Sequence, residues 1–507
     1  MNKLELMDYF FHPKNLTLVG VSRKLIGVSS MLLMSLIRKK FKGDIHLINK
    51  NIKDGHKIMG QPIKSDLNQI ESDLDLVYII VPSKAVPSVL EECSAKNMKA
   101  AVIISSGFSE SIGYNKDKLQ LQDEIVSIAR KNGFVFAGPN CNGIYSEDVS
   151  LYAIFGPRFI TIPNGHISVV SRGGTAGCNT INEIAKRGVG VSKFINLGDA
   201  ACLDLQDFIE YYNQDPVTKV IGVYTEGISD GKRFLKIARK CGYEKPVVMY
   251  KAGQTRAGQQ AATSHVGAIA GKFSNRIYEG FAKQTGIITV ESIIELADVC
   301  SSFMLTYLPK GKRVGVITPA GSLGVQASDA INNAGLELAT LNPATIEKLN
   351  GFLPEYWSHS NPIDLTDSMD FSVIGKLAKI LADEDNFDGM LVIFGDMPDD
   401  QESMAEMAGN IAEDMGLGDQ LESFRKMMEN EDMLITMLKS EIKKISRSMF
   451  KQKKPVFFLG SSQAKSGMPD MLREHKIVPL PETHRIARTY AALARWGEMT
   501  QMKQILS

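Results

Sequence analysis

Three times along the chain, an apolar, strand-like run breaks into a glycine-rich loop that a helical pattern follows. These runs are Leu16–Ser22, Ile167–Gly174 and Val314–Gly324. They begin about 150 residues apart, which is an ordinary domain size. Near-continuous apolar strands that alternate with helices are typical of parallel sheets covered on both faces. The pattern therefore predicts an α/β protein with three doubly wound parallel-sheet domains, called here the first, second and third modules.

Each module contains further apolar runs with the length and residue types of buried strands. The predicted strands are 16–20, 45–48, 76–81, 101–105 and 134–137 in the first module, 167–171, 193–197, 220–225, 246–251 and 287–290 in the second, and 314–318, 336–341, 389–394, 455–459 and 477–480 in the third. With these strands assigned, we expect the modules to span residues 1–147, 148–308 and 309–507.

One segment of the third module breaks this rhythm. Residues 397–450 are rich in acidic residues and methionine and contain no strand-like run. Leu421–Met449 has a helical pattern, so we expect a helical insertion. Methionine is a flexible apolar side chain, and its frequency here favours a helix core or a contact with a partner helix over a metal site.

Composition narrows the class of protein. Of the 507 residues, 44% are hydrophobic; Lys and Arg number 58 and Asp and Glu 57, so the net charge is +1. Such a balance gives no field that attracts nucleic acid or a membrane surface. No apolar run is long enough for a transmembrane helix, and the first residues lack a signal-peptide core. The 6 dispersed cysteines favour a reducing compartment, so we expect a cytoplasmic protein.

Ligands of open parallel sheets bind beyond the carboxyl ends of the strands. In the first module these ends are small, polar or rich in glycine, and one precedes a helix whose amides suit a phosphate. The candidate ligand-binding residues are Gly20, Ser22, Arg23, Asn49, Lys50, Val81, Pro82, Ser105, Gly107 and Asn140. A structural tight turn at Gly20 and a solvated loop position for Lys50 are the alternatives.

The second module offers more specific chemistry. Ser171, Gly173 and Gly174 form a loop whose backbone amides suit an anion, and Glu226 ends the next-but-one strand. His265 lies in a loop of small residues that follows the fourth strand. A carboxylate that holds one imidazole nitrogen leaves the other nucleophilic. These residues predict that His265 accepts a phosphoryl group, supported by Glu226 and by loop amides.

Other chemistries lack their motifs. The chain has no GxSxG nucleophile elbow and no Walker A motif. No cluster of metal-ligating residues lies near His265 in the sequence, so we predict no metal site on this chain.

Several motifs resemble those of one family, the α subunits of the NDP-forming acyl-CoA synthetases, which include ADP-forming acetyl-CoA synthetase and are related to succinyl-CoA synthetase. The matching segments are 11–14 with 19–22, 138–143, 192–198, 226–228, 251–258, 263–268 and 361–364. The segment from Lys251 to Ala268 is the most specific of them.

The resemblance implies a fold, a reaction and roles for these residues. The first module would be a Rossmann-like CoA-binding domain, and the other two would be flavodoxin-like. His265 would be the phosphorylated histidine and Glu226 its support. Ser171, Gly173 and Gly174 would bind phosphate together with Gly321 and Ser322 of the third module. The reaction would convert acyl-CoA, phosphate and ADP reversibly to acid, CoA and ATP through an acyl phosphate.

The resemblance also implies a partner. ADP or ATP with Mg²⁺ would bind mainly to an ATP-grasp β subunit, for which this chain has no room, and the assembly would be α2β2. The chain departs from the family at Ser29 and Ser30, where glycine is usual, and at Arg172, where glutamine is common. Two alternatives stay open: a CoA- or carbamoyl-type acyl transferase without ATP-grasp chemistry, and a non-catalytic CoA-binding protein.

Overall fold

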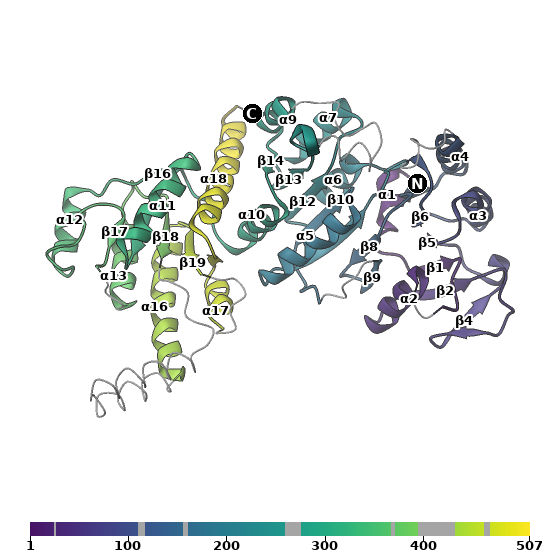
Figure 1. Cartoon of the computed structure of the whole chain (residues 1–507), viewed down its shortest axis with the longest axis horizontal. Coiled ribbons are helices and arrows are strands. Elements are labelled where there is room, and N and C mark those ends of the chain that lie inside the picture. Colours follow the sequence, from purple (N-terminus) through teal and green to yellow (C-terminus); the bar gives the residue numbers. More distant parts are fainter. Residues whose placement is uncertain are drawn as a thin grey trace. The chain divides into compact units, whose positions relative to one another are not determined.

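The chain forms three mostly parallel sheets with helices packed around them (Figure 1). The computed structural model describes residues 1–24, 27–109, 117–155, 161–258, 275–366, 371–393, 431–460 and 467–506. Residue contacts divide the chain into two compact units. The first unit, Met1–Ala185 with Val189–Cys300, contains two sheets, and the second, Lys186–Gly188 with Ser301–Ser507, contains one. The α/β class predicted from the sequence is therefore confirmed.

The first sheet has the strand order β3-β4-β2-β1-β5-β6-β7. All its neighbours pair in parallel except β3 with β4. From β4 to β7 the order is that of a Rossmann fold. Its elements are α1 (Lys3–Asp8), β1 (Asn15–Val19), α2 (Val28–Arg38), β2 (Asp44–Ile48), β3 (Lys57–Ile58), β4 (Gln61–Lys64), β5 (Leu76–Ile79), α3 (Val86–Ala95), β6 (Ala100–Ile103), α4 (Asp117–Asn132) and β7 (Val135–Ala137), with short 3-10 turns at Leu67–Gln69 and Ser83–Ala85.

The second sheet has the order β14-β13-β12-β10-β11-β8-β9. The strands β10 to β14 are parallel and follow the flavodoxin-like order, whereas β8 and β9 are antiparallel and extend the edge beyond β11. Its elements are β8 (Gly143–Ser146), β9 (Leu151–Ile154), β10 (Ile167–Ser171), α5 (Gly174–Lys186), β11 (Val191–Asn196), α6 (Leu205–Gln214), β12 (Val220–Thr225), α7 (Gly231–Cys241), β13 (Val247–Lys251), α9 (Asn275–Thr285), β14 (Ile288–Val290) and α10 (Ile293–Leu305).

The third sheet has the order β16-β15-β18-β19-β20, and β17 also pairs with β15. All these pairs are parallel. Its elements are β15 (Arg313–Thr318), α11 (Gly321–Asn333), β16 (Glu337–Leu338), α12 (Pro343–Asn350), β17 (Ile363–Asp364), α13 (Phe371–Ala382), β18 (Gly389–Ile393), α16 (Glu431–Lys451), β19 (Val456–Leu459), α17 (Met468–Glu474), β20 (Ile477–Leu480) and α18 (Thr483–Leu506).

Every predicted strand overlaps an observed one, because most of them are buried apolar runs. The sequence did not reveal β3, β4, β8, β9 or β17, which are only two to four residues long. The β8–β9 hairpin lies across the predicted boundary between residues 147 and 148, and the three domain ranges stay a prediction. Within the expected insertion, α16 confirms the end of the predicted helix, whereas residues 394–430 lie outside the described ones.

The N-terminal segment joins the first two modules through an aromatic core. The helix α1 begins with a capping box between Asn2 and Glu5. Phe10 and Phe11 follow the helix and are fully buried against α6. The ring centroids of Phe11 and Tyr211 are 5.2 Å apart. The two modules therefore share one hydrophobic core, as expected of a single compact unit.

A buried charge network lies beside this core. Lys193 on β11 has no exposed side-chain surface, and its Nζ lies 3.0 Å from a carboxylate oxygen of both Asp148 and Asp215. The His12 ring bridges Asp8, at 2.8 Å, and Asp148, at 3.1 Å. The hydrogen bond with Asp8 raises the pKa of His12 above 6.5. Burial would raise the pKa of Asp148, but hydrogen bonds from Lys193 and His12 lower it.

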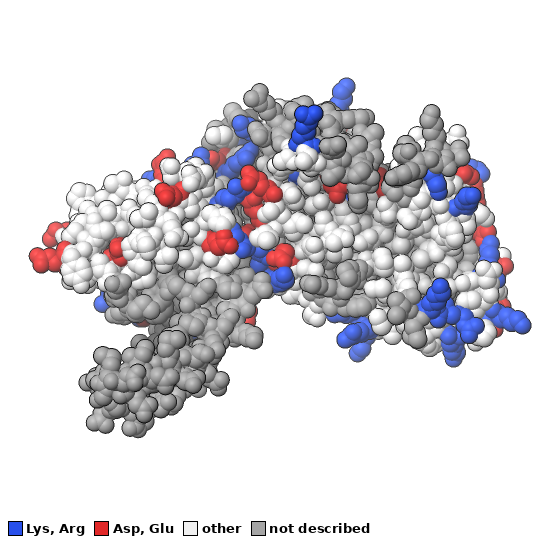
Figure 2. All heavy atoms as spheres, viewed as in Figure 1, with Lys and Arg blue, Asp and Glu red and all other residues white. Residues whose placement is uncertain are grey.

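The surface carries both signs of charge, as Figure 2 shows for one face. Positive side chains are frequent in the segment from Arg38 to Lys64, which forms the end of α2 and the strands β2 to β4. Among the described residues, no helix is long and apolar enough to cross a bilayer.

We expect Lys193→Met to lower the free energy of unfolding of the first unit by about 3 kcal/mol, because it leaves the buried Asp215 carboxylate without this cation. Urea unfolding measures the change. Lys240→Met, which removes an exposed ion pair with Glu210, is the control and should change stability by less than about 1 kcal/mol. Equal losses in the two variants would contradict the proposed importance of the buried network.

The same network predicts a pH dependence of stability. A raised pKa of His12 means that its contribution is complete below about 6.5 and is lost as the pH rises through the folded-state pKa. The lowered pKa of Asp8, due chiefly to its hydrogen bond with His12, acts in the opposite direction at acidic pH. The difference in unfolding free energy between wild type and His12→Gln, measured from about pH 5.5 to pH 8.5, should therefore fall with pH.

Candidate active site

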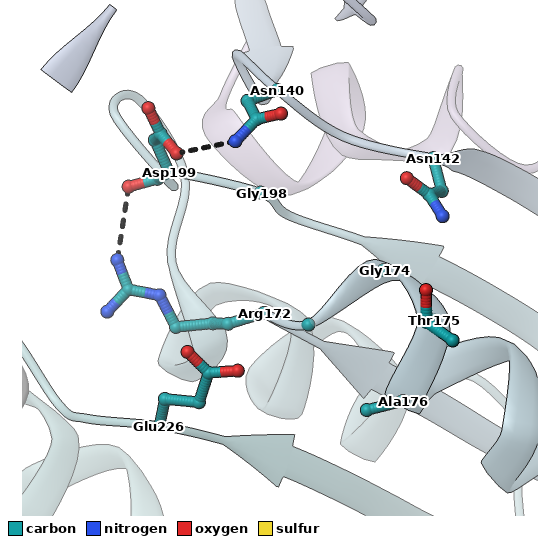
Figure 3. Close-up of a pocket in the computed structure, with 10 residues that line it drawn as sticks. Asn140, Asn142, Arg172, Gly174, Thr175, Ala176, Gly198, Asp199 and Glu226 are labelled. Carbon is teal, nitrogen blue, oxygen red and sulfur yellow. Dashed lines mark hydrogen bonds between the residues drawn. The ribbon is translucent and has the colours of Figure 1, made fainter. Parts of the chain in front are cut away.

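A cavity of about 330 Å³ lies in the first unit, at the carboxyl ends of β10, β11 and β12 (Figure 3). The order of these strands reverses direction at β10, so this is the crevice where doubly wound sheets bind ligands. The cavity is lined by Asn140, Asn142, Arg172, Gly173, Gly174, Thr175, Ala176, Gly198, Asp199 and Glu226. Residues from both the first and second modules therefore share it.

The start of α5 forms one wall of the cavity. A Cβ on Gly174 would lie 2.5 Å from the Asn142 amide nitrogen, and a Cβ on Gly173 would lie 2.7 Å from the Tyr224 ring. A Cβ at either position would crowd a neighbouring side chain, and with glycine at both the backbone itself borders the cavity. The first amides of a helix have no intrahelical acceptor and carry partial positive charge. This wall therefore suits an anion of the size of phosphate.

Glu226 stands at the end of β12 and lines the same cavity. The Tyr224 hydroxyl, two residues earlier on the same strand, donates a hydrogen bond of 3.4 Å to Glu226 Oε1. Burial, followed by the nearby Glu226 carboxylate, raises the pKa of Tyr224, so its hydroxyl stays a hydrogen-bond donor. The sequence prediction that Glu226 and the Gly173–Gly174 loop lie on one side of the sheet agrees with this arrangement.

Arg172 connects the three strand ends that surround the cavity. Its side chain is buried, and its Nη2 donates to the Asp199 carbonyl oxygen at 3.1 Å (Figure 3). Its Nη1 lies 3.4 Å from the Gly227 carbonyl oxygen, and its Nε lies 4.0 Å from Asp204. Arg172 thus braces the loops after β11 and β12. Ser171 is also internal, because its hydroxyl donates to the Gly173 carbonyl at 2.6 Å.

His265 lies outside the described residues, as do all residues from 259 to 274. The described segment before them is held next to Glu226. The Ala252 amide donates to the Thr225 carbonyl oxygen at 2.8 Å, and Lys251 pairs with Thr225 in the sheet. Lys251 Nζ then donates to the Gly253 carbonyl at 2.8 Å. The segment that leads to His265 therefore leaves the sheet beside the Glu226 strand end.

The candidate CoA-binding residues lie at adjoining strand ends of the first sheet. A Cβ on Gly20, whose φ is +92°, would lie 2.5 Å from the Ile80 carbonyl oxygen, so the loop after β1 packs directly on the end of β5. The Asn49 side-chain amide donates to the Val21 carbonyl oxygen at 2.6 Å. Ser105 in turn donates to the Val81 carbonyl, immediately before Pro82. These residues lie on adjoining loops at the edge of the sheet where doubly wound folds bind ligands, and we call this edge the candidate CoA crevice.

Ser29 and Ser30, where the resemblance led us to expect glycine, hold the first loop together. The Ser22 amide donates to Ser29 Oγ at 3.0 Å, and Ser30 donates to the Lys24 carbonyl. Arg23 is exposed between them.

The remaining candidates of this module are more dispersed. Lys50 is exposed and makes a 2.7 Å ion pair with Glu92. This arrangement agrees with the alternative interpretation, in which Lys50 is a solvated loop residue. Gly107 has a φ of +100° and lies against Ser83. Asn140 lines the cavity, and its backbone amide donates to the Ser105 carbonyl oxygen at 2.9 Å.

Gly321 and Ser322 belong to the second unit, where they begin α11 directly after β15. A Cβ on Gly321 would lie 3.0 Å from an Asp364 carboxylate oxygen. Their assignment to phosphate binding stays a prediction.

Besides Thr175 and Ala176 at the start of α5, three lining residues in loops were not singled out from the sequence, namely Asn142, Gly198 and Asp199. Each lies in or next to a quoted motif, 138–143 or 192–198. Their position after strand ends was the available signal, but only the packing of the two modules brings these loops together.

Comparisons with known proteins agree with this geometry. The family described as "CoA binding domain" matches residues 14–147, and "Succinyl-CoA ligase like flavodoxin domain" matches residues 164–303. The α subunit of acetate–CoA ligase [ADP-forming] II of Pyrococcus furiosus is 35% identical over 76% of this chain and 82% of its own length. The α subunit of acetate–CoA ligase [ADP-forming] I from the same organism is 29% identical over 97% of this chain and 98% of its own.

A solved structure is also similar along the whole chain. It is the dinucleotide forming acetyl-coenzyme A synthetase 1 of Ca. Korarchaeum cryptofilum in complex with phosphate and ADP, with a TM-score of 0.78 and 26% identity over 100% of this chain and 99% of that one. Several other relatives are longer proteins, of which this chain spans about half. The chain belongs to the family of the α subunits of ADP-forming acetate–CoA ligases.

Proposed function

We propose that this chain is the α subunit of an ADP-forming acyl-CoA ligase that uses His265 as its phosphoryl carrier. The observation that carries the proposal is the cavity at the start of α5, which Glu226 lines and beside which the described segment before residue 259 leaves the sheet. Acyl-CoA, phosphate and ADP would be converted reversibly to acid, CoA and ATP. The names of the relatives, which are acetate–CoA ligases, support this reaction class.

CoA would bind at the crevice of the first module. The loops after β1, β2, β5 and β6 supply backbone amides and small polar side chains there. CoA carries several phosphate groups, and the lysine-rich segment from Arg38 to Lys64 lies in the same module. Phosphates are stabilised by such cations and by the start of α2.

The chemistry would begin in the cavity at the start of α5, called here the phosphate cavity. A phosphate oxygen attacks the thioester carbonyl carbon, the C–S bond breaks, and CoA leaves as a thiol after taking up a proton. The product is an acyl phosphate whose phosphoryl group stays at the start of α5. The helix amides stabilise its negative charge, which is the role of an oxyanion-binding site.

The second step would transfer the phosphoryl group to His265. A neutral imidazole nitrogen attacks phosphorus, the P–O bond to the acyl group breaks, and the acid leaves as a carboxylate. A Glu226 carboxylate bonded to the other ring nitrogen keeps the attacking nitrogen free and stabilises the positive charge that develops on the ring. The phosphoryl group then passes to ADP, which regenerates neutral His265.

ADP and Mg²⁺ would bind mainly to a partner subunit. The names of the relatives specify an α subunit, which implies a partner. We propose that this partner is an ATP-grasp β subunit and that the assembly is α2β2. The relative that was solved with phosphate and ADP supports a nucleotide site in the complete enzyme.

We expect the chain, mixed with its ATP-grasp partner, to form ATP from acetyl-CoA, phosphate and ADP. His265→Asn should abolish ATP formation and the acid-labile incorporation of radioactive phosphate. Glu226→Gln should lower kcat about a hundredfold, because the amide cannot stabilise the charged ring. Full activity of His265→Asn would refute the carrier, and turnover without any nucleotide-binding partner would favour an acyl transferase instead.

The phosphate cavity makes a separate prediction. Gly174→Ala places a Cβ against the Asn142 amide and should raise KM for phosphate about tenfold, equivalent to about 1.4 kcal/mol. KM for acetyl-CoA should change little. Gly231→Ala is the matched control, since a Cβ there meets no atom within 4 Å. Steady-state kinetics with each substrate varied in turn checks this, and an unchanged KM for phosphate in Gly174→Ala would place the anion elsewhere.

A further inference from the structure

Asp199 occupies an unusual junction at the carboxyl end of β11. The preceding residue, Gly198, has a φ of +53°, and a Cβ there would lie 2.2 Å from the Pro139 carbonyl oxygen and 2.3 Å from that of Asn140. Only glycine fits so close an approach. The second module is thus pressed against the loop of the first module that precedes β8, and Asp199 follows directly.

Donors from the first module hold both carboxylate oxygens of Asp199. The Ser109 hydroxyl donates to Oδ2 at 3.1 Å, and the Asn140 side-chain amide, Nδ2, donates to Oδ1 at 3.4 Å (Figure 3 shows the second bond). Ser109 follows the end of β6, and Asn140 follows the end of β7. Hydrogen bonds to a charged acceptor are stronger than neutral ones. One carboxylate therefore holds two loops of the candidate CoA crevice.

Asp199 also lines the phosphate cavity, and its backbone makes hydrogen bonds on both sides of the junction. Its amide donates to the Pro139 carbonyl at 3.0 Å, and its carbonyl oxygen accepts the 3.1 Å bond from Arg172. Arg172 comes directly before Gly173 and Gly174, which begin α5. A single residue thus connects the loops of the CoA crevice to the wall of the phosphate cavity.

We propose that Asp199 is a positioning residue that aligns the thioester of acyl-CoA in the first module with the phosphate in the second. This inference rests on the proposed function. The two reactants would be held by different modules, so the attack distance depends on how these modules meet. A displacement of about 1 Å between reacting groups can slow a reaction about a hundredfold.

Alignment explains the contacts of Asp199 better than phosphate binding does. A carboxylate repels a phosphate anion, and both oxygens of Asp199 accept hydrogen bonds from the first module. The role therefore concerns the step between acyl-CoA and phosphate. The later exchange between phosphohistidine and ADP uses neither CoA nor the crevice loops, so it should not depend on Asp199.

The test separates these two steps in the complete enzyme, assembled from this chain and its ATP-grasp partner. For Asp199→Ala, we expect kcat for ATP formation from acetyl-CoA to fall about thirtyfold to a hundredfold. The ADP–ATP exchange that passes through phosphohistidine should stay within about twofold of wild type. Asp199→Asn should recover much of the loss, because its amide oxygen can accept the bond from Asn140 while its amide group donates to the Ser109 hydroxyl.

A double-mutant cycle identifies the contact that matters. Ser109→Ala should lower kcat about fivefold, and Ser109→Ala with Asp199→Ala should be no slower than Asp199→Ala alone. Asp123→Asn, which removes an exposed carboxylate on α4, is the control and should match wild type. If Asp199→Ala fails to fold, Ser109→Ala provides the same comparison of the two steps at smaller amplitude.

Three results would overturn the inference. One is an Asp199→Ala enzyme with wild-type kcat. Another is an equal fall of both steps, which would indicate general loss of structure. The third is a wild-type enzyme that forms no ATP with its partner, which would overturn the proposed function as well; in the first two cases the proposed function stands.

Discussion

The close backbone contact between Gly198 and the carbonyl oxygens of Pro139 and Asn140 is the constraint on which the site depends. It brings the end of β11 against the last loop of the first module, with no side chain between them. The cavity at the start of α5 is lined from both sides of this contact. Without it, the candidate CoA crevice and the candidate phosphate cavity would belong to two separate surfaces.

The N-terminal segment reinforces the same junction from a different side. Phe10 and Phe11 pack on α6, and His12 and Lys193 connect the modules through Asp148. Apolar burial supplies the non-directional attraction, whereas the buried charges tolerate only a narrow geometry because each needs its partners. A reaction between ligands held by two modules requires that kind of definite geometry, and the shared core explains why both modules form one compact unit.

Arg172 and the serines of the first loop, where the resemblance led us to expect other residues, each support a loop of the candidate site. Arg172 fills a buried position between loops and makes hydrogen bonds there to carbonyl oxygens. Ser29 and Ser30 bond to backbone groups of the glycine loop that they follow. In both cases a polar side chain satisfies backbone groups that would otherwise need other partners. These side chains thus act on loop geometry.

The sequence by itself determined the α/β class, most strands of the three sheets and the strand ends that carry Gly173, Gly174 and Glu226, because buried parallel strands are continuous apolar runs and ligands bind where those runs end. It did not reveal the β8–β9 hairpin, whose strands are short, or the parts played by Asn142 and Asp199. Those residues are polar loop positions like many others in the chain. Only the tertiary structure distinguished them, since hydrogen bonds between loops that are distant in sequence form after two modules have packed against each other.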